Sequence, residues 1–327
     1  MQMRFGLGCR LRRLAKGAAI CLVLCTLSVP AFGIVITNVS DPNYITGDAN
    51  YTGVAQVVFD YTGQSGTFLC TGSLISDFQI LTAGHCASGA ENWTVTFQTP
   101  SGTTSMGVSQ ALVHPAFGPE PVPLYSQLYE NDVAILTLAS IAPSDATRYL
   151  LDTTFSGAYP TSPIDIVGYG LGGSATTGIL PLGVRRHAVN TIDALFPLPD
   201  YPFEMNMTVG AAPDNYGLIS DGDSGSPAFL NGRIIGVGAF ADTYNGIYPS
   251  ITYTSGHSNL LDPTVGNWVA GSVAPEPATF GLLVSGLAGL VVVRRRRRQI
   301  RVRSTSPKRC APSLGSLGSA NGSRTRI

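Results

Sequence analysis

The chain has 327 residues, a length that suits one large all-β domain or two ordinary domains. Its formal net charge is zero, but between residues 34 and 273 four arginines stand against 19 acidic residues, a net charge of −15. A body of this sign repels the phosphates of nucleic acids, which argues against a nucleic-acid partner. The other basic residues flank an apolar stretch near each end of the chain.

Residues 1–33 have the pattern of a secretory signal peptide. Five basic residues among the first 16 lead into an apolar run, which ends in small residues that suit cleavage after Ala31 or after Gly33. A buried core helix is the alternative, but no polar residue interrupts the faces of this run. We therefore expect the mature chain to be exported, with residues 34–44 as an N-terminal segment or short propeptide.

The exported body contains two cysteines, Cys70 and Cys86. A single pair in an oxidising compartment predicts one disulfide. A disulfide that closes a loop of this size stabilises a fold by about 3 kcal/mol. The alternative, a metal site with two cysteine ligands, lacks a second ligand pair at a suitable spacing. The sequence therefore predicts no metal and no other cofactor.

The body consists of short runs rich in Val, Ile, Thr, Tyr and Phe, separated by Gly, Pro, Asn and Asp. Such runs favour strands, and many short strands at regular spacing predict a sandwich or a barrel. Asn231-Gly232 predicts a tight hairpin turn, and a short helix is expected near residues 262–269. In chain order, the predicted strands include residues 53–61, 93–99, 131–138, 164–170 and 233–240.

Residues 221–227 read DGDSGSP, a stretch that alone is more typical of an ordinary loop than of a nucleophile. A serine nucleophile needs a base within hydrogen-bond reach, and His85 in LTAGHC is a candidate. Asp132 opens the apolar run NDVAILTL, where a carboxylate is costly to desolvate unless it is paired. A histidine N–H would pair with it and leave the other ring nitrogen to accept the serine proton. We interpret Ser224 as nucleophile, His85 as general base and Asp132 as its orienter.

Over residues 45–270 the chain resembles the trypsin-like, chymotrypsin-fold serine proteases. The resemblance is carried by CTGSLISDFQILTAGHC at 70–86, NDVAILTL at 131–138, VGYG at 167–170 and GDSGSP at 222–227. It implies two six-stranded antiparallel β-barrels with a short C-terminal helix and the triad between them. The N–H groups of Gly222 and Ser224 would form the oxyanion hole. The domain would extend over residues 45–271.

The resemblance also assigns supporting roles. Asp223 would pair with the ammonium group of a new N-terminus, either Ile34 or Ile45, and spacing to Cys70 favours Ile45. Counting back from the nucleophile places Leu218 at the floor of the substrate pocket, which excludes Lys and Arg side chains and favours apolar ones. The pocket wall would comprise Ala239, Phe240 and Ala241. The remaining histidines are interpreted as structural or surface residues, namely His114, His187 and His257.

Ala239 takes the place of a serine whose hydroxyl usually supports the triad aspartate. This departure leaves two functions open. The first is an exported serine endopeptidase that acts on polypeptides through an acyl-enzyme intermediate. The alternative is a catalytically weak or silent protease-fold protein with a binding or matrix role.

Residues 272–298 combine Pro275-Glu276-Pro277, an apolar run and five arginines. This segment resembles the PEP-CTERM sorting signal of Gram-negative bacteria, which an exosortase recognises and cleaves. It implies a transmembrane helix that holds the chain transiently in the inner membrane before it reaches the cell surface or the exterior. A simple tail anchor is the alternative. Residues 299–327 are predicted to be a disordered basic tail.

Overall fold

The computed structural model describes residues 34–47, 49–119, 129–154, 161–174, 177–195, 203–207, 213–242, 253–273 and 294. The predicted signal peptide, both predicted terminal apolar helices and the basic tail lie outside these ranges. Within them, none of the helices has the length and hydropathy needed to cross a membrane.

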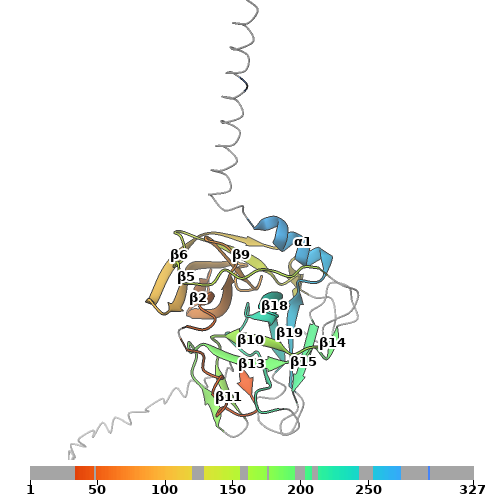
Figure 1. Cartoon of the computed structure of the whole chain (residues 1–327). Helices are drawn as coiled ribbons and strands as arrows, with labels where there is room; N and C mark the ends of the chain where they lie inside the picture. Colours follow the sequence, from red (N-terminus) through yellow and green to blue (C-terminus); the bar gives the residue numbers. More distant parts are fainter. Residues whose placement is uncertain are drawn as a thin grey trace, which may run out of the picture. The chain divides into compact units, whose positions relative to one another are not determined.

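The first half of the body is a closed, antiparallel six-stranded barrel (Figure 1). Its alternating pattern is seen in β2, where Val57 and Phe59 are buried while Val58 between them is partly exposed. Val57 lies opposite Val95, and the side chains of Val57, Phe59, Val95 and Phe97 are at most 1 % exposed. Each such burial contributes about 1.5–3 kcal/mol. The barrel strands, in spatial order, are β2 Val54–Tyr61, β3 Thr67–Leu74, β4 Gln79–Thr82, β9 Ala134–Leu138, β6 Gly102–Val113 and β5 Ala90–Thr99.

The second half is also built from strands, which form two sheets in the described ranges. The seven-stranded sheet runs in the order β13 Arg186–Asn190, β10 Ile164–Gly168, β17 Pro227–Leu230, β18 Arg233–Asp242, β19 Tyr253–Asn259, β15 Phe203–Met207 and β14 Ala194–Leu195. The four-stranded sheet runs in the order β12 Gly178–Leu180, β11 Gly172–Ser174, β1 Val35–Ile36 and β16 Gly217–Leu218. A bridge between Val189 and Tyr216 connects the two sheets. A shared core of aliphatic side chains, among them Ile34, Ile166 and Ile235, fills the space they enclose.

Two short-range predictions are confirmed. Asn231 and Gly232 have φ angles of 50° and 75° and join β17 to β18, as a tight turn with two left-handed residues requires. The predicted short helix is α1, Pro263–Ser272. Asp262 caps it, because its Oδ1 accepts the N–H of Thr264 at 2.7 Å. Pro263 suits the first helical position, because it has no N–H group that would need an acceptor there.

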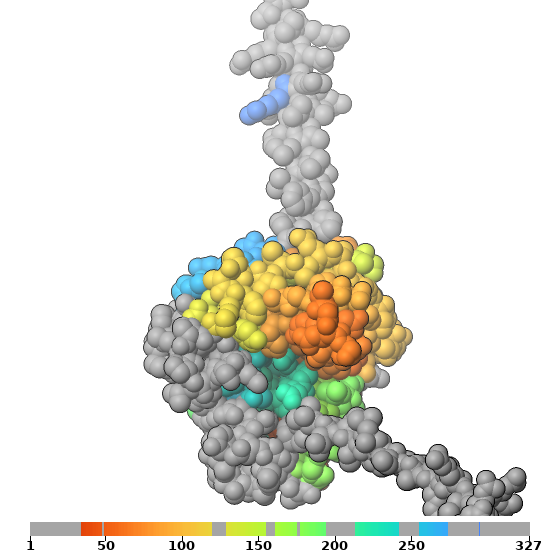
Figure 2. Space-filling view, turned by 180° about the vertical axis from the view of Figure 1, so that it is seen from behind, coloured from red at the N-terminus to blue at the C-terminus, as the bar shows by residue number. Residues whose placement is uncertain are grey.

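The two halves contact each other beside β3 of the barrel. Figure 2 shows the orange and yellow surface of the barrel against the green and teal surface of the second half. At this contact the N–H of Thr71 donates to the carbonyl of Ser224 at 2.8 Å, and its hydroxyl donates to the carbonyl of Gly222 at 3.0 Å. A third contact is the N–H of Tyr169, which donates to the Thr71 hydroxyl at 3.0 Å. Thr71 therefore fixes the 222–224 turn against the barrel.

Candidate active site

His85 and Asp132 form a close pair. His85 follows β4 in the turn Ala83–Cys86, and Asp132 lies two residues before the neighbouring β9, Ala134–Leu138. The Nδ1 atom of His85 lies 2.7 Å from Oδ2 of Asp132, and the backbone N–H of His85 donates to Oδ1 at 2.7 Å. The Asp132 side chain is 1 % exposed and that of His85 is 21 % exposed. One residue thus supplies two donors to a buried carboxylate.

This geometry sets the tautomer and the basicity of His85. A carboxylate accepts hydrogen bonds, so Nδ1 carries the proton and Nε2 is left as the acceptor. Burial lowers the pKa of His85, while the charge of Asp132 and its hydrogen bond raise it by more, so that the net shift is upward. The arrangement suits a general base.

Two further residues allow Asp132 to occupy this position. A Cβ at Gly84 would lie 3.1 Å from Oδ1 of Asp132 and 2.8 Å from the ring of Phe117, so glycine permits the close approach. From β19, the buried hydroxyl of Ser258 donates to the backbone carbonyl of Asp132 at 3.1 Å. Sequence reasoning missed Ser258, because its proximity to Asp132 depends on the path of β19 and no local motif marks it.

Ser224 lies at the same edge of the barrel as His85. Its carbonyl accepts from Thr71 and lies 3.8 Å from Sγ of Cys86, the residue after His85. The next residue, Gly225, has a φ of +85°, and a Cβ there would meet the carbonyl of Thr71 and the hydroxyl of Thr82 at 2.2 Å each. The chain can therefore pass this close to β3 and β4 only with glycine after the serine.

Cys70 and Cys86 form a disulfide, as predicted, with their Cα atoms 6.4 Å apart. It ties β3 to the residue after His85. Within the described ranges, these two sulfurs and His85 are the one group of His, Cys, Asp and Glu atoms close enough to hold a metal ion. Because the sulfurs are joined to each other, the group does not offer thiolate ligands.

The turn before Ser224 contains Gly222, which is predicted to contribute to the oxyanion hole, and Asp223, which is predicted to support it. Gly222 has a φ of +91°, and a Cβ there would lie 2.9 Å from Cα of Gly170. Asp223 is fully buried and accepts the N–H groups of Gly170 at 2.8 Å and Ser220 at 3.1 Å. Burial raises the pKa of Asp223 to about 8, against the opposing effect of these two donors. The turn therefore contains a carboxylate that is shielded from solvent and bonded to two backbone N–H groups.

The two candidates for a new N-terminus, Ile34 and Ile45, differ in their exposure to solvent. Ile34 is fully buried in the core of the second half, next to β1. Its carbonyl accepts the hydroxyl of Tyr44 at 2.7 Å. Ile45 is 59 % exposed and forms an isolated bridge with Arg186. The residue that sequence spacing favours is therefore the one that faces solvent.

The predicted pocket residues lie on two elements. Leu218 is on β16, pairs with Val35 and is 3 % exposed within the core cluster of the second half. Ala239, Phe240 and Ala241 are on β18 and are partly buried. The Phe240 ring lies over Gly256, where a Cβ would meet it at 2.1 Å.

Two other histidines, His114 and His257, are buried. His114 accepts the N–H of Ala116 at 3.2 Å and stands edge-on to Trp268, with ring centroids 4.8 Å apart. His257 is fully buried on β19, and burial lowers its pKa to about 3, so it is neutral at physiological pH. Both environments agree with the structural interpretation.

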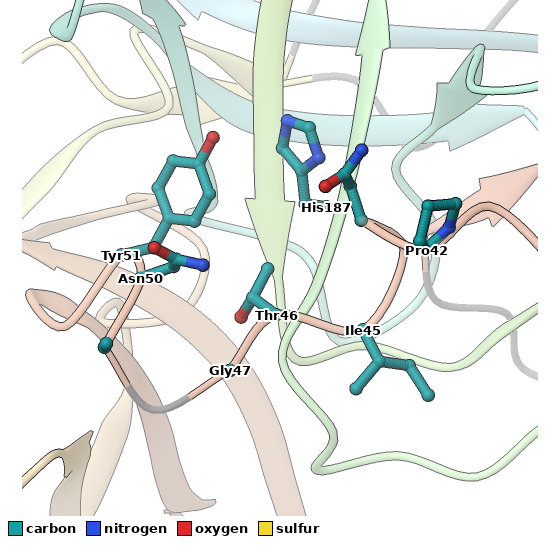
Figure 3. Close-up of a pocket in the computed structure, with 9 residues that line it drawn as sticks. Pro42, Ile45, Thr46, Gly47, Asn50, Tyr51 and His187 are labelled. Atoms are coloured by element: carbon teal, nitrogen blue, oxygen red, sulfur yellow. The ribbon is translucent and has the colours of Figure 1, made fainter.

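His187 has an acidic partner that sequence reasoning missed. Its Nε2 lies 2.7 Å from Oδ1 of Asp165, and its ring stacks on Tyr51 at 5.3 Å between centroids. It also lines a pocket of about 440 Å³ (Figure 3), where it comes from β13 and the other labelled residues from the segment 42–51. The pocket is lined by Pro42, Asn43, Ile45, Thr46, Gly47, Ala49, Asn50, Tyr51 and His187.

Comparison with solved structures shows which fold this chain has. A structure described as HL collagenase matches with a TM-score of 0.56 and 19 % identity, over 72 % of this chain and 99 % of its own. Neuropsin, a serine protease expressed in the limbic system of mouse brain, matches with a TM-score of 0.52 and 17 % identity, over 71 % and 98 %. The fold is that of the chymotrypsin-like serine proteases, and the prediction of an all-β chymotrypsin-like architecture is confirmed.

The sequence comparisons narrow the class to a family. The family model for trypsin matches residues 45–255, and the chain belongs to the trypsin family. It is 27 % identical over 237 residues to Trypsin Blo t 3 of Blomia tropicalis, covering 65 % of this chain and 81 % of that protein. It is 24 % identical over 207 residues to Trypsin beta of Drosophila erecta, covering 58 % and 76 %. A second model, for the PEP-CTERM protein-sorting motif, matches residues 273–298.

Proposed function

We propose that the chain is an active serine endopeptidase, with Ser224 as nucleophile, His85 as general base and Asp132 as orienter. The observation that carries the proposal is the double hydrogen bond from His85 to the buried carboxylate of Asp132, beside a turn that Thr71 holds against the barrel. Both donors, the backbone N–H and the ring Nδ1 of His85, come from one residue in the turn that follows β4. The arrangement requires no cofactor.

In this mechanism, Nε2 of His85 takes the hydroxyl proton of Ser224 as Oγ attacks the carbonyl carbon of the scissile peptide. The carbonyl electron pair moves to oxygen, and the imidazolium that forms is stabilised by Asp132. Collapse of the tetrahedral species breaks the C–N bond, and His85 returns the proton to the leaving amine. Water then hydrolyses the acyl-enzyme by the same two steps.

The negative charge on the carbonyl oxygen needs donors that are already in place. We assign this role to the backbone N–H groups of Gly222 and Ser224, on either side of the buried Asp223. Removing one such donor in a serine protease costs about 10²–10³-fold in kcat. The left-handed φ of +91° at Gly222 supports this assignment, because it is a conformation that glycine adopts without steric cost.

The alternative function, a silent binding or matrix protein, was suggested by the missing hydroxyl at Ala239. Ser258 supplies a hydroxyl to Asp132 from another strand, although it bonds the backbone carbonyl and not the carboxylate. Asp132 therefore keeps an additional contact. The presence of all three triad residue types, at Ser224, His85 and Asp132, favours the enzyme over the silent protein.

We further propose that the enzyme cleaves after apolar residues. Leu218 would provide an apolar floor and Ala239, Phe240 and Ala241 the wall, with no carboxylate to pair with a Lys or Arg side chain. An unpaired buried charge is strongly unfavourable, whereas an apolar side chain gains about 25 cal/mol per Å² buried. A peptide library should show cleavage after Ala, Val, Leu or Phe, and dominant cleavage after Arg or Lys would contradict this assignment.

We propose that the chain is exported after removal of residues 1–33 and is held at the inner membrane by the segment 272–298. An exosortase would then cut this segment and release the body to the cell surface or the exterior of a Gram-negative bacterium. The match of residues 273–298 to the sorting motif supports this route. The acidic body would leave without the arginine run.

Labelling with a fluorophosphonate probe tests the proposed function, since such probes react with an activated serine. The full-length chain should be labelled at Ser224, and Ser224→Ala should abolish both labelling and peptidase activity. Ser226→Ala is the matched control, because the buried Ser226 hydroxyl makes no hydrogen bond in the described part of the chain. A folded wild-type chain that is neither labelled nor active would support the silent protein instead.

A further inference from the structure

The backbone carbonyl of His85 is held by a side chain from another strand of the barrel. In the turn that carries His85, the carbonyl of Gly84 accepts the N–H groups of Ala87 at 3.0 Å and Ser88 at 2.8 Å. The carbonyl of His85 accepts the hydroxyl of Tyr61, the last residue of β2, at 2.8 Å. Carbonyls at the end of a helical turn lack a partner within the turn, and side chains can satisfy them. Tyr61 has this role for the proposed general base.

Aromatic packing fixes the direction of the Tyr61 hydroxyl. The Tyr61 ring meets the rings of Phe59 and Phe68 edge-on, with centroids 5.1 Å and 4.7 Å away. Phe59 is itself 1 % exposed in the core of the barrel. Edge-to-face contacts of this kind are favourable beyond the area that they bury. A ring held by two such contacts directs its hydroxyl at one place, the carbonyl of His85.

The bond from Tyr61 completes the attachment of His85 on both sides of its Cα atom. On the N-terminal side, the backbone N–H donates to Asp132 at 2.7 Å. On the C-terminal side, the carbonyl accepts from Tyr61. Peptide groups are planar, so fixing the planes before and after a residue fixes both of its backbone dihedral angles. The direction in which His85 projects its ring is therefore set by Asp132 and Tyr61 together.

The ring direction matters because a general base must lie within hydrogen-bond reach of the proton that it takes. Nδ1 of His85 is bonded to Asp132, so Nε2 is the nitrogen that has to meet the hydroxyl of Ser224. A misplacement of about 1 Å between reacting groups can cost about 10²-fold in rate. A contact that fixes the backbone of His85 can therefore act on the rate.

We propose that Tyr61 is a positioning residue for His85. Its hydroxyl holds the peptide group between His85 and Cys86, and this directs Nε2 of His85 at Ser224. The inference rests on the proposed function, because it concerns the base of the same triad. Tyr61 acts through His85 and has no assigned contact with the substrate.

Tyr61→Phe in the full-length chain tests this role, since it removes the hydroxyl and keeps the ring beside Phe59 and Phe68. It should lower kcat about 10-fold and leave KM within about twofold of the wild type, because a misplaced base affects the transition state and not substrate binding. The value of kcat is expressed per serine labelled by a fluorophosphonate at completion, so that unfolded chain is not counted. A kcat within about twofold of the wild type would overturn the proposal.

Tyr149→Phe is the matched control. Tyr149 is a buried tyrosine whose ring packs against Phe229 on β17, with centroids 4.7 Å apart. Its substitution should leave kcat per labelled serine within about twofold of the wild type, whatever its effect on Tm. Equal losses of kcat in the two phenylalanine variants would show that Tyr61 has only a structural role.

Coupling to Asp132 tests whether Tyr61 acts through His85. Residues that position one ring act as a unit, so their losses should not multiply. Tyr61→Phe should slow fluorophosphonate labelling about 10-fold in the wild type but less than about threefold in Asp132→Asn, where the ring is already misoriented. Equal factors in the two backgrounds would overturn the positioning role.

The proposed function and the role of Tyr61 fail in different ways. A folded wild-type chain that the fluorophosphonate does not label counts against the proposed function. A labelled wild type whose kcat and labelling rate are unchanged by Tyr61→Phe counts against the role of Tyr61 alone.

Discussion

At the scale of single residues, Asp132 shows how one buried carboxylate organises the site. Its carboxylate accepts hydrogen bonds from the backbone N–H and the ring Nδ1 of His85. Its backbone carbonyl accepts a hydrogen bond from the hydroxyl of Ser258. Charge-assisted bonds of this kind are about twice as strong as neutral ones. The charge of Asp132 and its hydrogen bond to the ring raise the pKa of His85 and leave Nε2 to accept a proton.

The pH dependence of activity follows from His85. The base works in its neutral form, so kcat/KM should fall as pH drops through the raised pKa of His85, above its ordinary value of 6.5. In Asp132→Asn the attraction is lost while burial remains, so the acidic limb should move to lower pH. The plateau should fall by about 10³–10⁴-fold, as is typical of such triads. A pH–rate profile whose acidic limb is unchanged in Asp132→Asn would contradict the assignment.

Two glycines with similar backbone angles allow a matched test of the loop. Gly225 has a φ of +85° and no space for a Cβ, whereas Gly232 has a φ of +75° and nothing within 4 Å. Gly232→Ala should therefore cost about 1–2 kcal/mol for the left-handed conformation alone. Gly225→Ala should cost at least about 2 kcal/mol more and lower kcat, because it pushes Ser224 away from β3 and β4. Urea unfolding of both variants checks this, and equal losses would refute the close packing.

At the scale of elements, the site forms where β3, β4 and β9 of the barrel meet the loop between β16 and β17. The disulfide joins the middle of β3 to the turn after β4, across a sequence separation of 16 residues. Thr71, next to Cys70, holds the 222–224 turn. The elements that carry His85 and Ser224 are therefore attached to the same strand.

Loss of the disulfide should destabilise this junction. Cys70→Ser/Cys86→Ser should lower the free energy of unfolding by about 3 kcal/mol, since the unfolded chain is no longer cross-linked. Cys310→Ser, in the basic tail, should leave it unchanged. Mass analysis after alkylation of the native protein should find Cys70 and Cys86 unmodified. Two alkylated thiols at these positions would disprove the bond in the native protein.

At the scale of the whole molecule, charge and processing are connected. The body between residues 34 and 273 is strongly acidic, while 16 of the 20 lysines and arginines lie in the segments predicted to be removed. Residues 273–298 match the sorting motif. Processing at both ends would therefore convert a chain of zero net charge into an acidic protein.

Mass spectrometry of the mature protein from its host should show a C-terminus near Pro275-Glu276-Pro277. Glu276→Ala should prevent the cut, because it removes the charged residue of the motif, and Thr279→Ser is the conservative control that should still be cut. Recovery of Arg294–Arg298 on the cell-surface form of the wild type would support a tail anchor instead.

Local patterns in the sequence sufficed for much of the fold. Strand alternation, the Asn231-Gly232 turn, the capped helix after Asp262 and the single cysteine pair each depend on residues close in sequence or on a unique partner. The His85–Asp132 pair was also predictable, since a carboxylate that opens an apolar strand requires a donor and the chain offers few histidines.

The tertiary structure decided the contacts that depend on register and on the packing of distant segments. It placed Leu218 in the core beside Val35, brought Ser258 to Asp132, and paired His187 with Asp165. It also brought Gly170 into hydrogen bonds with both Asp223 and Arg186. Nothing in the sequence near any of these residues specifies its partner. A side chain on a strand finds its neighbours across the sheet and between the two halves, and those neighbours are fixed only when the strands pair and the buried charges must be offset.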